Sequence, residues 1–197
     1  MRILITGASG TIGQAVAQLL GRRHEIVAAS RQKSAVTVDV TSEESIAAMY
    51  ERVGPVDSIV SLTGGARFAS LDKLTGEDFQ FSLGNKLMGQ VNILRLGIPY
   101  LRDGGSITLT SGVLAWKPMA GSAAISLVNA ALEGFAMAAA FEAPRGIRVN
   151  VVSPPWVTET LLAHKMPLAG GRAAADVAQL YAESVEGSGS GEVLAFK

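Results

Sequence analysis

The sequence predicts a single α/β domain in which a doubly wound parallel sheet of about seven strands carries helices on both faces. Short runs rich in valine and isoleucine alternate along the chain with longer segments whose apolar residues recur at helical spacing. Most of these runs lack strict alternation of apolar and polar residues, which is typical of strands buried on both faces of a parallel sheet. A chain of 197 residues suits one domain, so we expect a single domain over residues 1–197.

Seven short apolar runs are the predicted strands. They occupy residues 2–6, 24–30, 35–40, 56–62, 105–111, 146–153 and 191–196. Only residues 31–34 separate the second run from the third, whereas a parallel crossover normally needs about a dozen residues or more. Either the third strand is very short or the usual helix is missing, and we expect a loop at this connection.

Four helical segments lie between the runs. They occupy residues 11–21, 41–54, 77–96 and 122–142. Thr41 and Glu44 have the spacing of a capping box at the start of the second segment, and Gly54 ends it. The glycine- and serine-rich residues 186–191 predict a flexible surface turn before the last strand.

Composition and charge exclude several classes of function. Hydrophobic residues make up 48% of the chain and charged residues 17%, which is typical of a globular protein. The 17 basic and 17 acidic residues balance, and no Lys/Arg block appears, so we expect no nucleic-acid partner. The absence of cysteine excludes disulfides and thiol catalysis, and two histidines without clustered acids predict no metal site. We find no signal peptide and no apolar stretch of roughly 20 residues, and therefore expect a cytoplasmic protein without membrane contact.

A glycine-rich loop between the first strand and the first helix predicts a dinucleotide site. The segment "ILITGASGTIG" has the spacing G-x-x-G-x-x-G, which lets the backbone approach a pyrophosphate at the N-terminus of the helix. Glycines that serve only chain reversal are the less favoured alternative, because a strand precedes the loop and a helix follows it. The candidate contacts here are Gly7, Ser9, Gly10, Thr11, Ile12 and Gly13.

The end of the second strand predicts which dinucleotide binds. NAD-binding folds carry an acid about 20 residues beyond the glycine loop, where it binds the ribose 2′-hydroxyl. This chain has Ser30 and Arg31 there, followed by Lys33. Because an arginine can hold a 2′-phosphate with paired hydrogen bonds, NADP(H) is favoured over NAD(H). The alternative is that Arg31 is a solvated surface residue.

Together with these motifs, later segments resemble the short-chain dehydrogenase/reductase family over nearly the whole chain. Residues 57–65 stand where the family has its Asn-Asn-Ala-Gly signature, residues 105–112 resemble its serine-bearing strand, and residues 129–160 follow its helix, strand and loop. The resemblance implies a Rossmann fold and hydride transfer between a nicotinamide cofactor and a carbonyl or alcohol. It implies further cofactor contacts at Asp39, Val40, Thr63, Gly64, Pro154, Val157 and Thr158.

The chain departs from the family at the catalytic positions. The family's Tyr-x-x-x-Lys pair falls on Ile125 and Asn129, while Lys86 stands where the family has an asparagine on the preceding helix. This suggests that the family's lysine and asparagine are exchanged between two helices, with Ser111 as the serine that polarises the substrate. The alternatives are a solvated Lys86, an Asn129 that only packs, and a Ser111 hydroxyl satisfied by backbone.

Two functions follow from these residues. The first is an NADP(H)-dependent oxidoreductase that acts on an unidentified small molecule through a rearranged acid. The second is a non-catalytic NADP(H)-binding sensor or scaffold, which the loss of the tyrosine favours. The glycine spacing is also more typical of the family's atypical branch, which includes non-catalytic dinucleotide sensors.

Two further segments carry expectations of their own. Residues 156–172 predict a short lid with a hinge at Gly170 and Gly171, in which a lone His164 beside Lys165 is expected to be solvated. Residues 130–141 are small and apolar almost all round, which predicts that one face packs on the sheet and the other on a partner subunit, in a homodimer or homotetramer. Trp116 and Trp156 follow two of the strands and either line a pocket or only pack.

Overall fold

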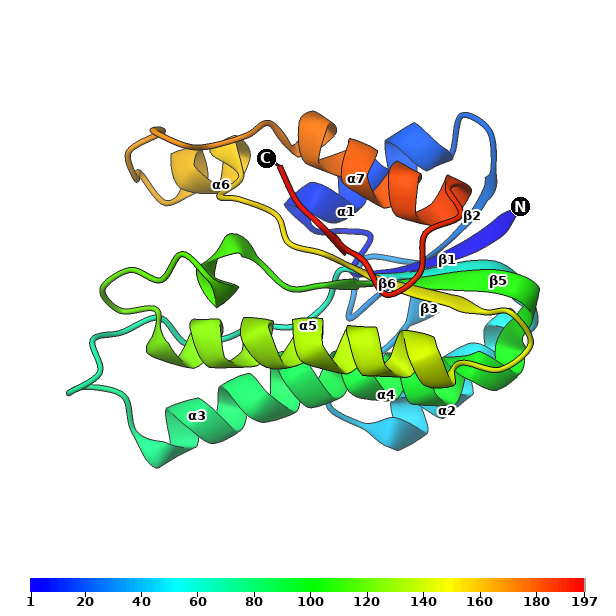
Figure 1. The fold of residues 1–197 in the computed structure, drawn as a ribbon, viewed down its shortest axis with the longest axis horizontal. Coiled ribbons are helices and arrows are strands. Elements are labelled where there is room, and N and C mark those ends of the chain that lie inside the picture. Colours follow the sequence, from blue (N-terminus) through cyan, green and yellow to red (C-terminus); the bar gives the residue numbers. More distant parts are fainter. Residues whose placement is uncertain (197) are drawn as a thin grey trace.

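Seven parallel strands form one sheet in the order β3-β2-β1-β4-β5-β6-β7. The computed structural model describes residues 1–196. The strands are β1 (Arg2–Thr6), β2 (Glu25–Ser30), β3 (Val36–Thr37), β4 (Val56–Ser61), β5 (Leu101–Thr110), β6 (Arg148–Val152) and β7 (Val193–Leu194). This confirms the predicted fold class and the number of strands (Figure 1).

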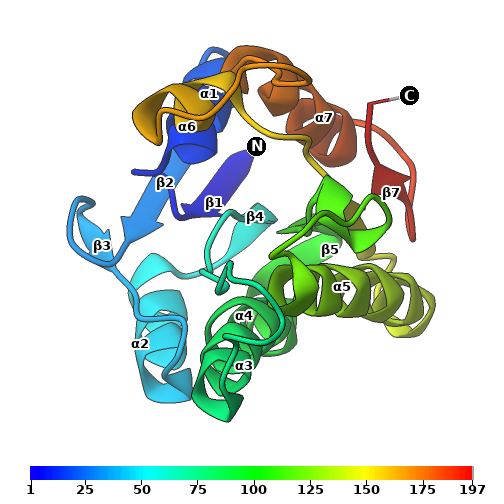
Figure 2. The same cartoon turned by 90° about the vertical axis from the view of Figure 1, so that its left-hand side faces the viewer.

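Helices cover both faces of the sheet, as the sequence predicts. They are α1 (Thr11–Leu20), α2 (Glu43–Val53), α3 (Gly76–Ser82), α4 (Gly89–Gly97), α5 (Ala123–Glu142), α6 (Thr158–Ala163) and α7 (Ala174–Glu186). A π-helical segment joins α3 to α4 at Leu83–Met88, and short 3₁₀ turns cover Ile98–Tyr100 and Val113–Ala115. Helices α2 to α5 lie on one face, and α1 and α7 lie on the other (Figures 1 and 2).

The strands bury their side chains on both sides, which explains why their sequences lack alternation. In β1, Leu4 belongs to the core cluster that also holds Ile46 of α2 and Leu132 of α5. Its neighbours Ile3 and Ile5 belong to the opposite cluster, with residues of α1 and α7. All three β1 side chains are fully buried, so both faces of the strand are selected for apolar residues.

Several boundaries differ from the sequence-based expectation. Helix α2 is capped by Ser42, whose hydroxyl accepts a hydrogen bond from the backbone N–H of Ser45 at 3.1 Å. The predicted cap, Thr41, instead donates from its backbone and hydroxyl to the carboxylate of Asp39. Strand β5 begins four residues before the predicted start at residue 105, and α7 was not assigned from the sequence at all. The expected loop between β2 and β3 is confirmed.

Helix α5 is long and apolar enough to cross a membrane by length and composition, which corrects the expectation that no such stretch exists. In the structure this helix packs on the sheet, where Val128, Leu132 and Ala136 are fully buried. Its outer surface exposes Leu127, Met137 and Phe141. The face that was predicted to pack on the sheet does so, and the face predicted to meet a partner subunit is the exposed one.

Candidate active site

The phosphate loop lies at the carboxyl edge of the sheet, between β1 and α1. Gly7 has a φ of 79° and packs so closely on the backbone of Leu62 that an added Cβ would lie 2.5 Å from its carbonyl oxygen. A Cβ on Gly13 would collide with the carbonyl oxygen of Gly7. These two glycines let the loop fold over the start of α1, whose free backbone N–H groups form an anion site.

A cleft of about 440 Å³ runs from this loop to the end of β2. Its walls include predicted contacts from four segments: Gly7, Ser9, Gly10, Ser30, Arg31, Lys33, Val40, Thr63 and Gly64. Ser30 organises its far end, because its hydroxyl accepts from the backbone N–H of Lys33 at 3.1 Å and from the hydroxyl of Ser34 at 2.9 Å. The exposed Arg31 stands beside this turn, where a 2′-phosphate would be reached.

Four predicted cofactor residues do not line the cleft or the adjoining cavity, namely Thr11, Gly13, Asp39 and Thr158. Gly13 is buried against the backbone of Gly7. Thr11 is exposed at the start of α1, and Thr158 uses its backbone N–H to bond the carbonyl oxygen of Arg172. The carboxylate of Asp39 accepts two hydrogen bonds from Thr41, which hold its pKa below the usual range. Val38, which we did not predict, lies on the cleft wall instead.

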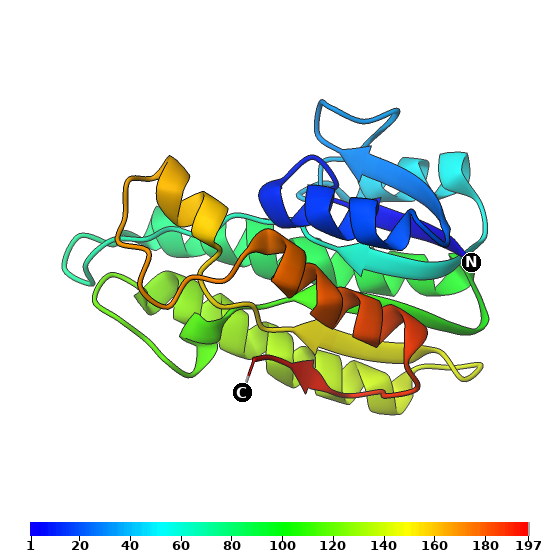
Figure 3. The same ribbon diagram turned by 90° about the horizontal axis from the view of Figure 1, so that it is seen from above.

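A second cavity of about 320 Å³ adjoins the cleft and shares Leu62, Thr63 and Gly64 with it. Its other lining residues include all three catalytic candidates, Lys86, Ser111 and Asn129, and the predicted cofactor residues Ile12, Pro154 and Val157. Ile125 also lines it, so the position of the missing tyrosine faces this cavity. The carboxyl ends of β1, β4, β5 and β6 thus build one continuous site, at the end of the molecule where the long loops project (Figure 3).

Lys86 reaches into the cavity from the π-helical segment. Its amine donates a hydrogen bond to the backbone carbonyl oxygen of Ser111 at 2.9 Å. Gly64, with a φ of 109°, packs directly on the Lys86 backbone and leaves no room for a side chain there. π-Helical turns occur frequently at functional sites, and here the turn coincides with the one charged residue of the cavity wall.

Burial makes the charged form of the Lys86 amine less stable than it is in water. The residue is partly buried, and within residues 1–196 no carboxylate forms an ion pair with it. Desolvation by burial lowers the pKa of Lys86 to about 8. Lys86 is therefore not the solvated helix residue that the sequence left open as an alternative.

Asn129 approaches the same strand end from the other side. Its amide nitrogen donates to the backbone carbonyl oxygen of Gly112 at 3.3 Å, next to the carbonyl that Lys86 binds. The Oδ1 atom is buried and has no hydrogen-bond partner within the described part of the chain. A buried acceptor without a partner is costly, so this atom fits a donor supplied by a ligand.

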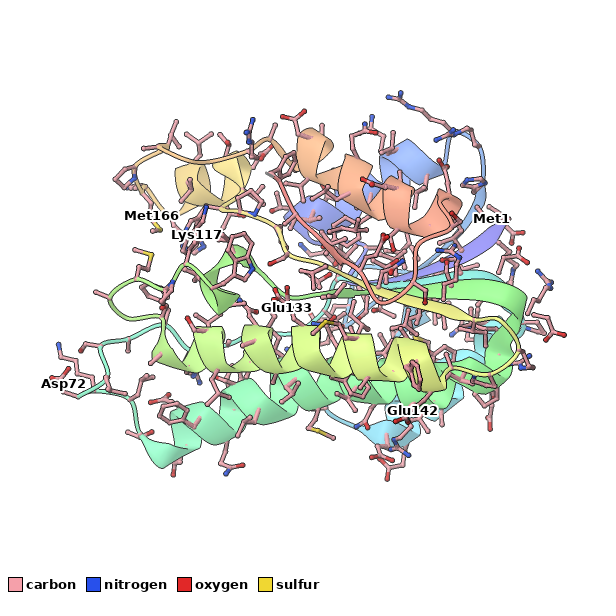
Figure 4. All side chains as sticks on the ribbon, in the orientation of Figure 1. Met1, Asp72, Lys117, Glu133, Glu142 and Met166 are labelled. Carbon is pink, nitrogen blue, oxygen red and sulfur yellow. The ribbon has the colours of Figure 1, made fainter. Side chains whose placement is uncertain are left out.

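The Ser111 hydroxyl is already engaged by a residue that sequence reasoning passed over. It donates to the carboxylate of Glu133 at 2.7 Å, and the hydroxyl of Ser153 donates to the same oxygen at 2.9 Å. Glu133 rises from α5 toward the sheet between these two strand ends (Figure 4). Glu133 is the one ionisable residue within residues 122–135, and this isolated charge in an apolar helix is the signal that the sequence offered. The hydroxyl proton that was predicted to polarise the substrate is thus bound by Glu133, whereas the carbonyl oxygen of Ser111 accepts from Lys86.

The remaining candidates divide between the cavity and the surface. Trp156 lines the cavity, whereas Trp116 is half exposed and lines a smaller pocket beside it. His164 is exposed after α6, as expected of a solvated histidine. The ends of the segment 156–172 are tied together, because Arg172 donates its backbone N–H to the carbonyl oxygen of Trp156 at 2.9 Å.

Comparison with known proteins places this site in a family. The sequence profile described as enoyl-(acyl carrier protein) reductase matches residues 7–193, nearly the whole chain. The chain belongs to the short-chain dehydrogenase/reductase family. Hydroxynaphthalene reductase arp2 of Aspergillus fumigatus is 29% identical over 178 residues, which cover 78% of this chain and 65% of that protein. The chain therefore spans about two thirds of the length of this relative.

Two solved structures extend the comparison over the full length. The protein lin1944 from Listeria innocua is 43% identical, with a TM-score of 0.96 and complete coverage of both chains. A small-chain dehydrogenase in complex with NADPH is 26% identical, with a TM-score of 0.88 over all of this chain and 96% of the other. The profile match shows the family, and the solved structures share the fold over the full length of this chain.

Proposed function

We propose that this protein is an NADP(H)-dependent carbonyl reductase in which Lys86 supplies the proton. The observation that carries the proposal is the Lys86 amine in the cavity, bonded to the Ser111 carbonyl oxygen and without an acidic partner in residues 1–196. The cavity continues into the glycine-loop cleft through Leu62 and Gly64. An acid group therefore stands beside the place where the reactive end of a dinucleotide would lie.

The residues present fit NADP(H). The tight contacts of Gly7 and Gly13 leave the N-terminus of α1 open to a pyrophosphate, and Arg31 can bind a 2′-phosphate in a charge-assisted pair. The orphaned Oδ1 of Asn129 would accept from the bound cofactor or substrate. The similar small-chain dehydrogenase is known as an NADPH complex, which supports the same choice here. When bound, NADPH would supply a hydride to the carbonyl carbon of the substrate.

Lys86 completes the reaction by protonating the carbonyl oxygen. The substrate gains one hydride at carbon and one proton at oxygen, and so becomes an alcohol, while Lys86 becomes neutral and takes up a proton from solvent. An unperturbed lysine, with a pKa of about 10.4, is a weak acid near neutrality. Desolvation brings the pKa of Lys86 to about 8, close to the range in which a general acid is efficient. The carbonyl group of Ser111 holds the amine in place.

The competing function is NADP(H) binding without chemistry, and Ile125 at the tyrosine position is the observation that favours it. Measuring NADPH consumption with a panel of aldehydes and ketones, beside a direct titration of NADPH binding, separates the two. We expect turnover that depends on Lys86. Tight NADPH binding with no consumption for any carbonyl would reject the reductase.

We also propose that the protein self-associates through α4 and α5. A groove along these helices is lined mainly by apolar residues, among them Val91, Leu94, Ile98 and Phe135, with Arg95 and Glu142 beside them. Phe141 on the outer surface of α5 is 94% exposed. Exposed apolar surface of this kind marks interaction sites. Sedimentation at micromolar concentration should give a dimer or tetramer that Phe141→Glu weakens. A monomeric unmutated protein would contradict the proposal.

A further inference from the structure

We propose that the substrate is an uncharged aldehyde or ketone with an apolar body, which Phe68 and Trp156 hold at the mouth of the cavity. The inference rests on the proposed reductase function and names its substrate class. It follows from the charges of the cavity wall, from the state of its hydroxyl groups, and from the side chains where three loops meet.

The cavity wall carries one charge. Lys86 is the one ionisable side chain that lines it within residues 1–196. The apolar part of the wall consists of Ile12, Leu62, Val113, Leu114, Ile125, Pro154, Pro155, Trp156 and Val157. A charged substrate group would lose its hydration here without gaining a counter-ion, unless it paired with Lys86. A carboxylate on Lys86 would raise the pKa of the amine and occupy the position that the carbonyl oxygen needs.

The hydroxyl groups of the wall are largely committed to the protein. Thr110 donates to the backbone carbonyl oxygen of Ser61 at 2.6 Å and also bonds the hydroxyl of Tyr181 at 2.9 Å. The Ser111 hydroxyl donates to Glu133. The Thr63 hydroxyl bonds the hydroxyl of Ser61 at 3.2 Å, which leaves the Thr160 hydroxyl as the wall hydroxyl without a hydrogen bond in residues 1–196. The wall thus offers few free hydroxyl protons to a polyhydroxylated ligand such as a sugar.

The loops that follow β4, β5 and β6 meet around Phe68 at the mouth of the cavity. Its ring packs edge-to-face on Trp156, with centroids 6.3 Å apart. Beside it, the backbone N–H of Ala69 donates to the carbonyl oxygen of Gly121 at 3.0 Å, which ties the β4 loop to the β5 loop. Phe68 nevertheless keeps 47% of its surface exposed, although Trp156 beneath it lines the cavity. The loops project together at one end of the molecule in all views (Figures 1 and 3).

More apolar side chains stand exposed on the same loops, namely Leu71, Trp116, Met119 and Leu168, and Leu162 stands exposed on α6. Figure 4 shows the neighbouring Asp72, Lys117 and Met166 at this end. An exposed apolar rim around a reactive cavity is typical of a ligand-binding site. Since the cavity holds only about 320 Å³, a longer apolar chain would extend from Lys86 past Trp156 to Phe68.

The test measures kcat/KM with NADPH for straight-chain aldehydes from butanal to decanal, and for benzaldehyde against 4-carboxybenzaldehyde. We expect a rise of about fourfold for each added methylene, equal to about 0.8 kcal/mol, until the chain passes the mouth. The carboxylated aldehyde should react at least about 100-fold more slowly than benzaldehyde, because its charge would be buried without a partner.

Three variants locate the effect. Phe68→Ala and Trp156→Ala should lower the ratio of kcat/KM for decanal to that for butanal about tenfold, because one aromatic contact to the longer chain is worth roughly that factor. Phe81→Ala is the matched control, since Phe81 packs on Arg67 and does not line the cavity within the described residues. Independence of chain length, a preference for the carboxylated aldehyde, or an equal effect of Phe81→Ala would overturn the inference.

A binding experiment separates failure of the proposed reductase function from failure of the ligand class. If no carbonyl consumes NADPH, binding of decan-1-ol in the presence of NADPH is measured by calorimetry. Binding weakened by Phe68→Ala but not by Phe81→Ala would support the apolar ligand class while the reductase function fails. No binding of decan-1-ol would overturn the ligand class as well.

Discussion

Replacing Lys86 by methionine should make the protein more stable and less active at the same time. The folded state lowers the pKa of this amine from 10.5 to about 8 because burial desolvates the charge. The unfolded chain therefore binds more protons between these two pH values, and the free energy of unfolding of the unmutated protein rises with pH across this window. At about 1.4 kcal/mol for each unit of pKa shift, burying the charged amine lowers the free energy of unfolding at pH 7 by at most about 3 kcal/mol.

Urea unfolding at pH 7 and at pH 10 measures this cost. We expect Lys86→Met to be more stable by about 1–3 kcal/mol at pH 7, with a difference that shrinks toward pH 10. The exposed Lys73→Met is the control and should change stability little at either pH. The same Lys86 variant should lose about 10²- to 10⁴-fold in carbonyl reduction, the usual contribution of a general acid. If Lys86→Met is less stable than the unmutated protein at pH 7, or if the difference in stability between the two proteins does not depend on pH, the Lys86 amine is not a desolvated cation.

Three other predictions test the site. Arg31→Asp should erase or reverse a roughly ten- to hundred-fold preference for NADPH over NADH, and equal affinities in the unmutated protein would contradict the 2′-phosphate assignment. The rate of reduction should be flat below about pH 7 and fall above about pH 8, because Lys86 must carry its proton, and this break should be missing in Lys86→Met. Gly13→Ala should lose more than about 100-fold in NADPH affinity or fail to fold, because its Cβ meets the Gly7 carbonyl oxygen, whereas Gly76→Ala, with open space around it, should bind NADPH normally.

Most of the fold could be predicted because its signals are local. Strands buried on both faces leave apolar runs, and the glycine loop marks the first strand and helix. The helix at residues 174–186 carried a readable signal in Val177, Tyr181 and Val185, which recur every four residues and are all buried. The first residues of β5 gave no such signal, because "LRDGG" is mostly polar and glycine-rich. Leu101 is in the strand because it pairs with Val56 across an irregular register.

The catalytic candidates were harder to place because their partners are distant in sequence. The family register led to Lys86 and Asn129, but the π-helical turn that carries Lys86 leaves no visible mark in "LGNKLM". The engagement of Ser111 by Glu133 joins a strand end to a helix 22 residues later, and Ser153 joins the same carboxylate from another strand. Such convergence depends on the completed sheet, so sequence reasoning could name the residues but not their bonds.

The short connection between β2 and β3 is a segment that can be exchanged between related proteins without changing the core. Residues 31–35 replace a whole crossover helix, and all but Ser34 are exposed, so no core side chain depends on them. Arg31, which we propose binds the 2′-phosphate, therefore lies on a five-residue surface segment whose Lys33 and Ser34 are hydrogen-bonded to Ser30. We expect that replacing residues 31–35 by a different segment of the same length would change the coenzyme preference without altering the packing of either helical layer on the sheet.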